Sequence, residues 1–198
     1  MSGPATAVFG GSFDPVHLGH LHVIGLVRSC TVFTTILVVP NRQNPLKTRG
    51  PGAGCEDRLQ MLQRALATFG NCRVSREELD RPGPSYAIHT LESLISSNQV
   101  ISRPGYILGD DLLKQLRNWY RWRDLLKTTV PVVITRDGDP SRLRESMPEL
   151  PDDTVFLQNP PHPASSSLVR ARIARGESPA DLLPQSVNEY IEYHRIYH

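Results

Sequence analysis

Two histidines beside a glycine pair are the residues of this chain best suited to chemistry on a phosphate. They lie in the string GGSFDPVHLGH, residues 10–20, where His17 and His20 are three positions apart. That spacing places both imidazoles on one face of a first helical turn. Gly10 and Gly11 allow backbone angles closed to other residues and leave room for a ligand beside the main chain. A lone histidine is usually a capping or buried structural residue, whereas two beside a glycine turn indicate a binding function.

The elements that must hold these histidines flank the string. The apolar run 5–9 predicts a short buried strand, and the periodic run 21–27 predicts a helix. Asp14 and Pro15 between them are typical of a turn. A helix N-terminus offers unpaired N–H groups and a positive dipole end, which favour a bound phosphate. We expect that a side chain larger than Gly19 would obstruct the phosphate.

The composition favours one globular domain spanning residues 1–198, with 39% hydrophobic and 21% charged residues. A net charge of +2 gives no reason to expect nucleic acid or a membrane surface as a partner. Neither a membrane-length apolar stretch nor a signal peptide is recognisable, so we expect a cytoplasmic protein. The three cysteines lack CxxC spacing, which indicates neither a disulfide framework nor a zinc site.

Strands and helices alternate along the rest of the sequence. Apolar and β-branched runs predict further strands at 34–39, 72–75, 106–108, 130–135 and 154–157. Helical spacing predicts helices at 56–69, 86–96, 112–117, 165–175 and 187–197, and 79–85 is expected to be a loop. Strand, helix and strand at this spacing form a βαβ unit, so we expect parallel pairing, with ligands at the carboxyl edge of the sheet.

Several polar groups are predicted at that edge. Residues 41–54 form a basic loop containing Lys47, although such charges alone are typical of a solvated loop. Gly109 and Asp111 follow a strand, where a glycine and an acid often meet a ribose hydroxyl, but Asp111 serves equally well as a helix N-cap. Arg136, after the next strand, is expected to be a surface arginine.

The serine run that opens helix 165–175 is a second candidate phosphate site. Ser165, Ser166 and Ser167 are good helix caps. Their hydroxyls, the free N–H groups and Arg170 three positions on would also bind a triphosphate. Ser85 is likewise a predicted cap, for helix 86–96.

Trp119 and Trp122 are three residues apart and would project from one side of a helix. Tryptophan is usually a packing residue, and we expect this role for Trp122.

The string at 10–20 resembles the signature of the HxGH nucleotidylyltransferases and, within them, the bacterial nicotinate-nucleotide adenylyltransferases. Five further strings resemble segments of that family: NPLK at 44–47, PSYAIHTLE at 84–92, GDDLLKQLRNW at 109–119, SSSLVR at 165–170 and LLPQSVNEYI at 182–191. The resemblance implies an α/β, Rossmann-like, doubly wound parallel sheet with helices on both faces. It also implies adenylyl transfer from ATP, accompanied by Mg²⁺, to nicotinate mononucleotide.

The resemblance carries roles to matching positions of this chain. It implies that His17, His20, Lys47 and Arg170 are catalytic, with His20 steadying charge at the reacting phosphorus. It implies acceptor contacts from Lys47, Ser85, Tyr86 and Trp119, whose indole would stack on the pyridine ring. The implied ATP contacts are Gly10, Gly11, Ser12, Phe13, His17, His20, Gly109, Asp111, Ser166, Ser167 and Arg170.

Departures from the family pattern leave the acceptor open. Ala87 and His89 stand where the family has threonine and aspartate, and Asn44 and Leu46 replace proline and histidine beside Lys47. The alternatives are a related enzyme that uses nicotinamide mononucleotide, phosphopantetheine or a CTP-dependent acceptor, and a regulatory module that binds nucleotide without catalysis. The intact His17, His20 and Arg170 argue against the regulatory module. The sequence leaves the oligomeric state open.

Overall fold

The structure, a computed structural model, describes residues 5–45, 50–101, 103–136, 139–160 and 162–198. The strands are β1 (Ala5–Gly11), β2 (Phe33–Pro40), β3 (Cys72–Val74), β4 (Gly105–Gly109), β5 (Val130–Thr135) and β6 (Val155–Gln158). The helices are α1 (Leu18–Cys30), α2 (Cys55–Leu66), α3 (Glu77–Asp80), α4 (Ala87–Ser96), α5 (Asp110–Gln115), the 3₁₀ helix η1 (Leu116–Asn118), α6 (Trp122–Thr128), α7 (Pro140–Ser146), α8 (Ser166–Ala174) and α9 (Gln185–His194). None of the helices among these residues has the length and apolar composition needed to cross a membrane.

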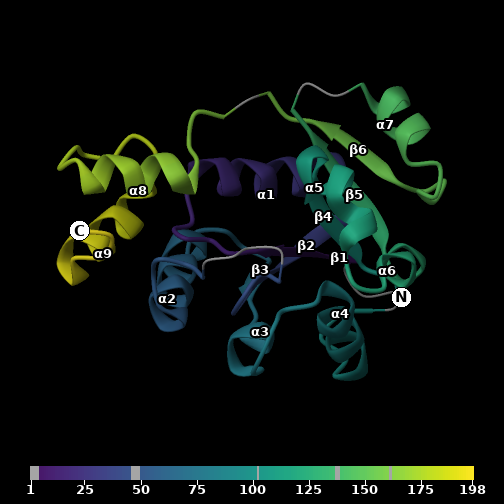
Figure 1. Cartoon of the computed structure of the whole chain (residues 1–198), viewed down its shortest axis with the longest axis horizontal. Helices are drawn as coiled ribbons and strands as arrows, with labels where there is room; N and C mark the ends of the chain where they lie inside the picture. Colours follow the sequence, from purple (N-terminus) through teal and green to yellow (C-terminus); the bar gives the residue numbers. More distant parts are fainter. Residues whose placement is uncertain (1–4, 46–49, 102, 137–138, 161) are drawn as a thin grey trace.

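All six strands form one parallel sheet in the order β3-β2-β1-β4-β5-β6. Figure 1 shows α1 on one side of the sheet and α3 and α4 on the other. The expected Rossmann-like, doubly wound α/β fold is therefore confirmed. Because β2 and β4 flank β1, the strand order reverses at β1, and the carboxyl end of β1 lies at the switch point where such sheets bind ligands.

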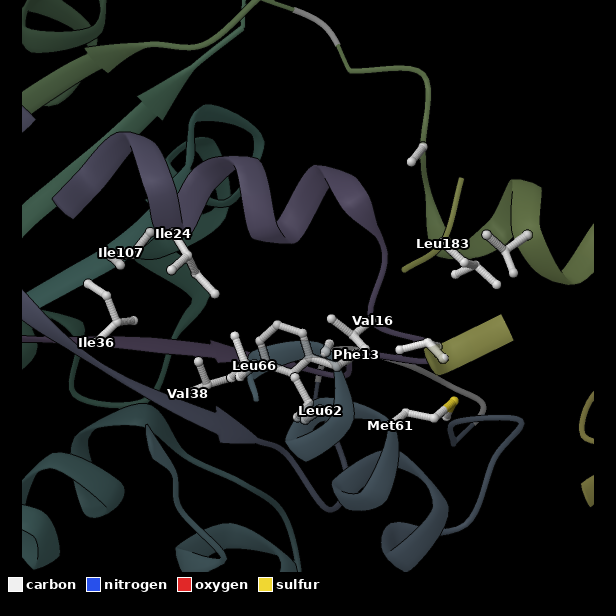
Figure 2. Close-up of a cluster of buried hydrophobic side chains, with 14 of the residues drawn as sticks. Phe13, Val16, Ile24, Ile36, Val38, Met61, Leu62, Leu66, Ile107 and Leu183 are labelled. Atoms are coloured by element: carbon white, nitrogen blue, oxygen red, sulfur yellow. The ribbon is translucent and has the colours of Figure 1, made fainter. Parts of the chain in front are cut away.

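Successive residues of the strands supply two separate cores, because side chains alternate between the faces of a sheet. Val38 and Ile107 pack with α1, α2, α8 and α9 in one cluster, part of which is drawn in Figure 2. Val39 and Leu108, the next residues along, pack with α4, α5, α6 and α7 in the other cluster. Both clusters continue to the carboxyl edge, so the turn after β1 rests on packed side chains.

The predicted strands are confirmed to within two residues at each end, whereas the predictions for 79–85 and for the two tryptophans were wrong and one helix was not predicted. The expected loop 79–85 begins inside α3. Helix α7, which no pattern had indicated, is capped by Asp139, whose carboxylate accepts the N–H of Ser141 at 2.9 Å. The two tryptophans do not share a helix: Trp119 ends η1, and Arg121 in the left-handed region (φ 49°) reverses the chain before α6. Trp122 is 8% exposed, in agreement with its expected packing role.

Candidate active site

Helix α1 begins directly after the turn that leaves β1, so its first N–H groups lie at the carboxyl edge of the sheet. His17 is the N-cap residue, with extended backbone angles. A Cβ on Gly19 would lie 3.0 Å from the His17 ring and 3.2 Å from the carbonyl oxygen of Ala164. A larger residue at 19 would therefore meet protein atoms before any phosphate, and Gly19 serves the packing of α1 against the segment that precedes α8.

The two histidine rings of the motif lie against each other, with centroids 3.7 Å apart. The backbone N–H of His17 donates to Nδ1 of His20 at 3.2 Å. An accepting Nδ1 carries no proton, so the neutral imidazole of His20 holds its proton on Nε2. His20 can thus donate one hydrogen bond from Nε2 while its ring is fixed from behind.

Both histidines are neutral at physiological pH. Burial, with smaller contributions from the nearby His162 and Arg136, lowers the pKa of His17 to about 4. Burial also holds the pKa of His20 well below its usual range, with a smaller contribution from His17. The site therefore presents imidazole N–H donors that cost no charge desolvation, and a bound phosphate would favour their protonation.

Phe13 supports His20 instead of facing a ligand. Its side chain is 2% exposed, and its ring centroid lies 4.9 Å from that of His20 in an edge-on arrangement. A Cβ on Gly11 would lie 3.0 Å from the Phe13 ring. Any contact of residue 13 with a nucleotide is thus left to its main chain, and Gly11 is needed for the ring to fold back under β1.

Arg58 of α2 and Asn41, just after β2, brace this turn. The buried guanidinium of Arg58 donates to the carbonyl oxygens of Ser12 and Asn41, both at 2.8 Å. The amide of Asn41 donates to Ser12 Oγ at 3.4 Å, while its Oδ1 is buried without a partner among the described residues. On the other side, a Cβ on Gly10 would lie 3.3 Å from the Tyr106 hydroxyl. A larger residue at position 10 would therefore press on the Tyr106 hydroxyl.

Helix α8 is fastened to the same turn. Ser165 is its N-cap, as predicted, and accepts the N–H of Leu168 at 3.2 Å. Ser166 Oγ donates to the carbonyl of Pro15 at 2.9 Å, across 151 residues of sequence. The structure thus brings the two predicted phosphate sites, the N-termini of α1 and α8, to one place.

Arg170 lies between these two helix ends. Its Nη1 donates to the backbone oxygen of Asp14 at 2.6 Å, and its Nη2 approaches the exposed hydroxyl of Ser167 at 3.5 Å. The side chain keeps 36% of its surface exposed. One edge of the guanidinium is therefore held, and the rest is available to an anion.

The end of β4 lies next to β1. A Cβ on Gly109 would collide with Oδ1 of Asp111, so a larger residue here would force the exposed Asp111 side chain to another position. Gly109 itself is the N-cap of α5, which excludes the capping role considered for Asp111. Asp111 is exposed, and its backbone N–H is bound by Asp110 Oδ1 at 2.9 Å. The predicted nucleotide contact of Asp111 stays a prediction.

The predicted acceptor residue Ser85 lies beside the loop after β2. Ser85 does not cap α4 as expected, since Tyr86 is the N-cap residue. Ser85 Oγ instead accepts the N–H of Arg42 at 3.1 Å, and its own N–H binds the carbonyl of Gln43 at 2.9 Å. This pairing joins the loop after β2 to the start of α4. Lys47 lies outside the described residues.

Aromatic rings gather beside this junction. The ring of Tyr86 lies 4.9 Å from that of Tyr120 and 5.6 Å from that of His89. Trp119 packs edge-on against Tyr106 at 6.3 Å, and its buried Nε1 has no partner among the described residues. Tyr106 of β4 thus fixes the indole of Trp119 from one side, and a fixed ring is suited to stack on a flat ligand.

Sequence reasoning missed Asp14 and His162 as site residues and placed Arg136 at the surface. Arg136 is exposed, as expected, yet its charge and that of His162 both act on His17. The carboxylate of Asp14 is 8% exposed and 3.6 Å from Arg170 Nη1. The turn signal at residue 14 carried no indication of this role, because the partners of Asp14 come from distant segments.

The sequence matches the model of the cytidylyltransferase-like family over residues 8–172. A curated relative from Roseiflexus castenholzii is 36% identical over 200 residues, and all of each chain is covered. A relative from Serratia proteamaculans is 32% identical over 96% of this chain and 94% of its own. Both bear the name "Probable nicotinate-nucleotide adenylyltransferase".

A solved structure of nicotinic acid mononucleotide adenylyltransferase from Plasmodium falciparum, complexed with NaAD, has the same fold. It superposes with a TM-score of 0.78 at 17% identity, covering 97% of this chain and 96% of the other. A second structure of that enzyme, complexed with APC, gives a TM-score of 0.76. On the family model and the full-length relatives, this chain belongs to the cytidylyltransferase-like family and, within it, to the nicotinate-nucleotide adenylyltransferases.

Proposed function

We propose that this chain transfers the adenylyl group of ATP to nicotinate mononucleotide, releasing nicotinate adenine dinucleotide and pyrophosphate. One observation carries the proposal: His17, His20 and Arg170 converge where the N-termini of α1 and α8 meet, at the switch point of the sheet. The names of the full-length relatives support the same reaction.

The chemistry asks little of the protein beyond placement. A phosphate monoester has a second pKa of about 6, so the acceptor is already ionised at pH 7 and needs no general base. One of its oxygens attacks the α-phosphorus of ATP, and the bond to the β-phosphate oxygen breaks to release pyrophosphate. Catalysis then consists of aligning the two phosphates and neutralising charge in the transition state.

The phosphate end of the site fits that task. Nε2–H of His20 is the donor we assign to the oxygens of the reacting phosphorus, and His17 with the N-terminus of α1 holds the neighbouring phosphates. Arg170 and the hydroxyl of Ser167 are assigned to the departing pyrophosphate, while Ser166, whose hydroxyl donates to the carbonyl of Pro15, holds the start of α8 in place beside them. Lys47, predicted from the resemblance, would meet the acceptor phosphate.

The acceptor end fits a flat aromatic base. Trp119 is assigned to stack on the pyridine ring, because its indole is backed by Tyr106. Tyr86 and Ser85 stand at the start of α4, next to the loop that follows β2. These assignments follow the resemblance and the placement of the residues together.

We assign Mg²⁺ as an ion that ATP would bring with it, coordinated by phosphate oxygens and water and not by a set of protein side chains. Across the described parts of the chain, no three His, Cys, Asp or Glu side chains are grouped so as to hold a metal ion. Mg²⁺ would shield the triphosphate oxygens while keeping most of its ligands as water.

The test is pyrophosphate release with ATP and Mg²⁺, comparing nicotinate mononucleotide with nicotinamide mononucleotide at equal concentrations. We expect much faster pyrophosphate release with nicotinate mononucleotide than with nicotinamide mononucleotide. Without an acceptor we expect no release. Equal or reversed preference would support adenylyl transfer but would mean that the chain accepts the amide, in line with the departures at Ala87 and His89. If neither acceptor supported pyrophosphate release, the proposed reaction would be refuted.

A further inference from the structure

The buried carboxylate of Asp14 collects donors from three distant segments. Its Oδ2 accepts the N–H of Gly52 at 2.7 Å, and its Oδ1 accepts the N–H of Ala53 at 2.9 Å. Oδ1 also accepts the hydroxyl of Tyr197 at 2.7 Å, across 183 residues of sequence. Arg170 approaches from the remaining side. A single side chain thus joins the turn after β1, the end of the loop after β2, α8 and the C-terminal tail.

The tail takes an unfavourable path to reach Asp14. After α9 the chain turns at Arg195 (φ 51°), and Tyr197 itself has φ 70°, both in the left-handed region that non-glycine residues avoid. The ring of Tyr197 then lies against Gly52, where a Cβ would be 3.4 Å from it. Such strain persists only where the surrounding contacts determine the conformation, which here means the contact with Asp14.

Tyr197 is held as a permanent donor. Burial, together with the hydrogen bond to Asp14, raises the pKa of its hydroxyl far above the usual value. The hydroxyl therefore keeps its proton and points it at Oδ1. Replacing it with hydrogen would leave one lone pair of a buried carboxylate unsatisfied, and a hydrogen bond to a charged group is stronger than one between neutral groups.

The geometry of Arg170 indicates why this matters. Its Nη1 is 2.6 Å from the backbone oxygen of Asp14 but 3.6 Å from carboxylate Oδ2. The carboxylate, occupied by three other donors, does not form a close ion pair with the arginine. The guanidinium is consequently anchored by a neutral carbonyl and retains its charge for a phosphate.

We propose that Tyr197 is a positioning residue, which acts through the Asp14 carboxylate to keep Arg170 available to the triphosphate of ATP. Without the hydroxyl, Oδ1 loses a hydrogen bond and the negative charge of the carboxylate is less neutralised. The carboxylate then draws Arg170, which faces Oδ2, into a close ion pair, and ATP competes with that pair. The inference rests on the proposed function, because Arg170 is taken to contact ATP.

A double-mutant cycle on ATP binding tests the coupling. The dissociation constant of ATP with Mg²⁺ is measured by calorimetry, without acceptor, for the wild type, Tyr197→Phe, Arg170→Ala and the double variant. We expect Tyr197→Phe to weaken ATP binding about tenfold, in line with the loss of one charged hydrogen bond, and to have less than about a twofold effect when Arg170 is absent.

Tyr190→Phe is the matched control. Tyr190 also donates from the tail helix α9 to a carboxylate, Asp57 Oδ1 at 3.1 Å, but this carboxylate belongs to α2 and not to the turn after β1. Urea unfolding reports the stability cost of each change, and we expect Tyr190→Phe to leave ATP binding unchanged. A chain ending at Ile196 removes both ring and hydroxyl and enters the same cycle as a second variant.

The outcomes separate the inference from the proposed function. Equal weakening by Tyr197→Phe with and without Arg170, or no weakening at all, would overturn the positioning role. Wild-type protein that binds ATP but fails to release pyrophosphate with either mononucleotide would overturn the proposed reaction and leave the cycle interpretable. A loss seen only with Arg170 present supports the role of Tyr197.

Discussion

The two ends of the site are built differently. At the phosphate end, His17 is 8% and Phe13 2% exposed, and the ring of His20 is fixed by a backbone N–H. At the acceptor end, Tyr120 is 51% exposed and His89 is also exposed. The fold thus fixes the phosphate-binding side chains before a ligand arrives. The aromatic side chains at the acceptor end keep exposed surface that a ligand could cover. We therefore expect substitutions at the phosphate end to reduce kcat and those at the acceptor end to raise KM.

The largest effect is expected for His20→Ala. It removes a fixed donor to the reacting phosphorus, and one such donor contributes about a hundredfold in rate. Steady-state pyrophosphate release measures the loss in kcat, and circular dichroism checks that the fold is retained. His22→Ala is the control, because His22 is an exposed histidine two residues further along α1. If His20→Ala had the kcat of the wild type, the expectation that substitutions at the phosphate end reduce kcat would be wrong.

Acid should destabilise the phosphate end in particular. His17 has its pKa lowered to about 4 in the folded protein, against 6.5 unfolded, so below pH 6.5 the unfolded chain binds the extra proton. Stability from this group is complete above pH 6.5 and is lost as the pH falls towards 4, by about 2 kcal/mol at pH 5. Urea unfolding at pH 8 and pH 5 measures the loss. His17→Asn should remove that part of the difference, and an unchanged difference would show that His17 is not buried in its neutral form.

Trp119→Ala tests the acceptor end. Loss of a stacking platform should raise the KM for nicotinate mononucleotide about tenfold, since aromatic stacking on a base contributes about 1–3 kcal/mol. The KM for ATP should change little, and Trp119→Phe should recover part of the loss. A fall in kcat with no change in KM would place Trp119 with the phosphate groups.

The smallest effect is expected for His89→Asp. The side chain is exposed and lies 5.3 Å from the Tyr120 ring, so a new negative charge near an anionic acceptor is strongly screened. We expect the KM for nicotinate mononucleotide to rise about twofold, within the range of exposed charge effects. The ratio of KM values for the acid and the amide is the measurement. A tenfold change in that ratio would mean that residue 89 selects the acceptor.

Local patterns were sufficient to predict most of the fold and the core of the site. Strand and helix periods depend on neighbouring residues, so all six strands and the long helices could be predicted. The strings around His17 and Ser165 each carry their own turn and cap chemistry. Convergence at one edge then followed from parallel strands. By contrast, Arg121 in the left-handed region gave no local signal, and it separates Trp119 from Trp122.

Only the tertiary structure decided the protonation states of the site residues and the hydrogen bonds that hold them in place. The neutrality of His17 follows from burial and from Arg136 and His162, which are more than a hundred residues away in sequence. The same holds for Asp14, whose partner Tyr197 is 183 residues away. The sequence alone determined which groups stand at the edge of the sheet. Their protonation and orientation depend on atoms brought close by folding, because desolvation and hydrogen bonding act over a few ångströms of space whatever the separation along the chain.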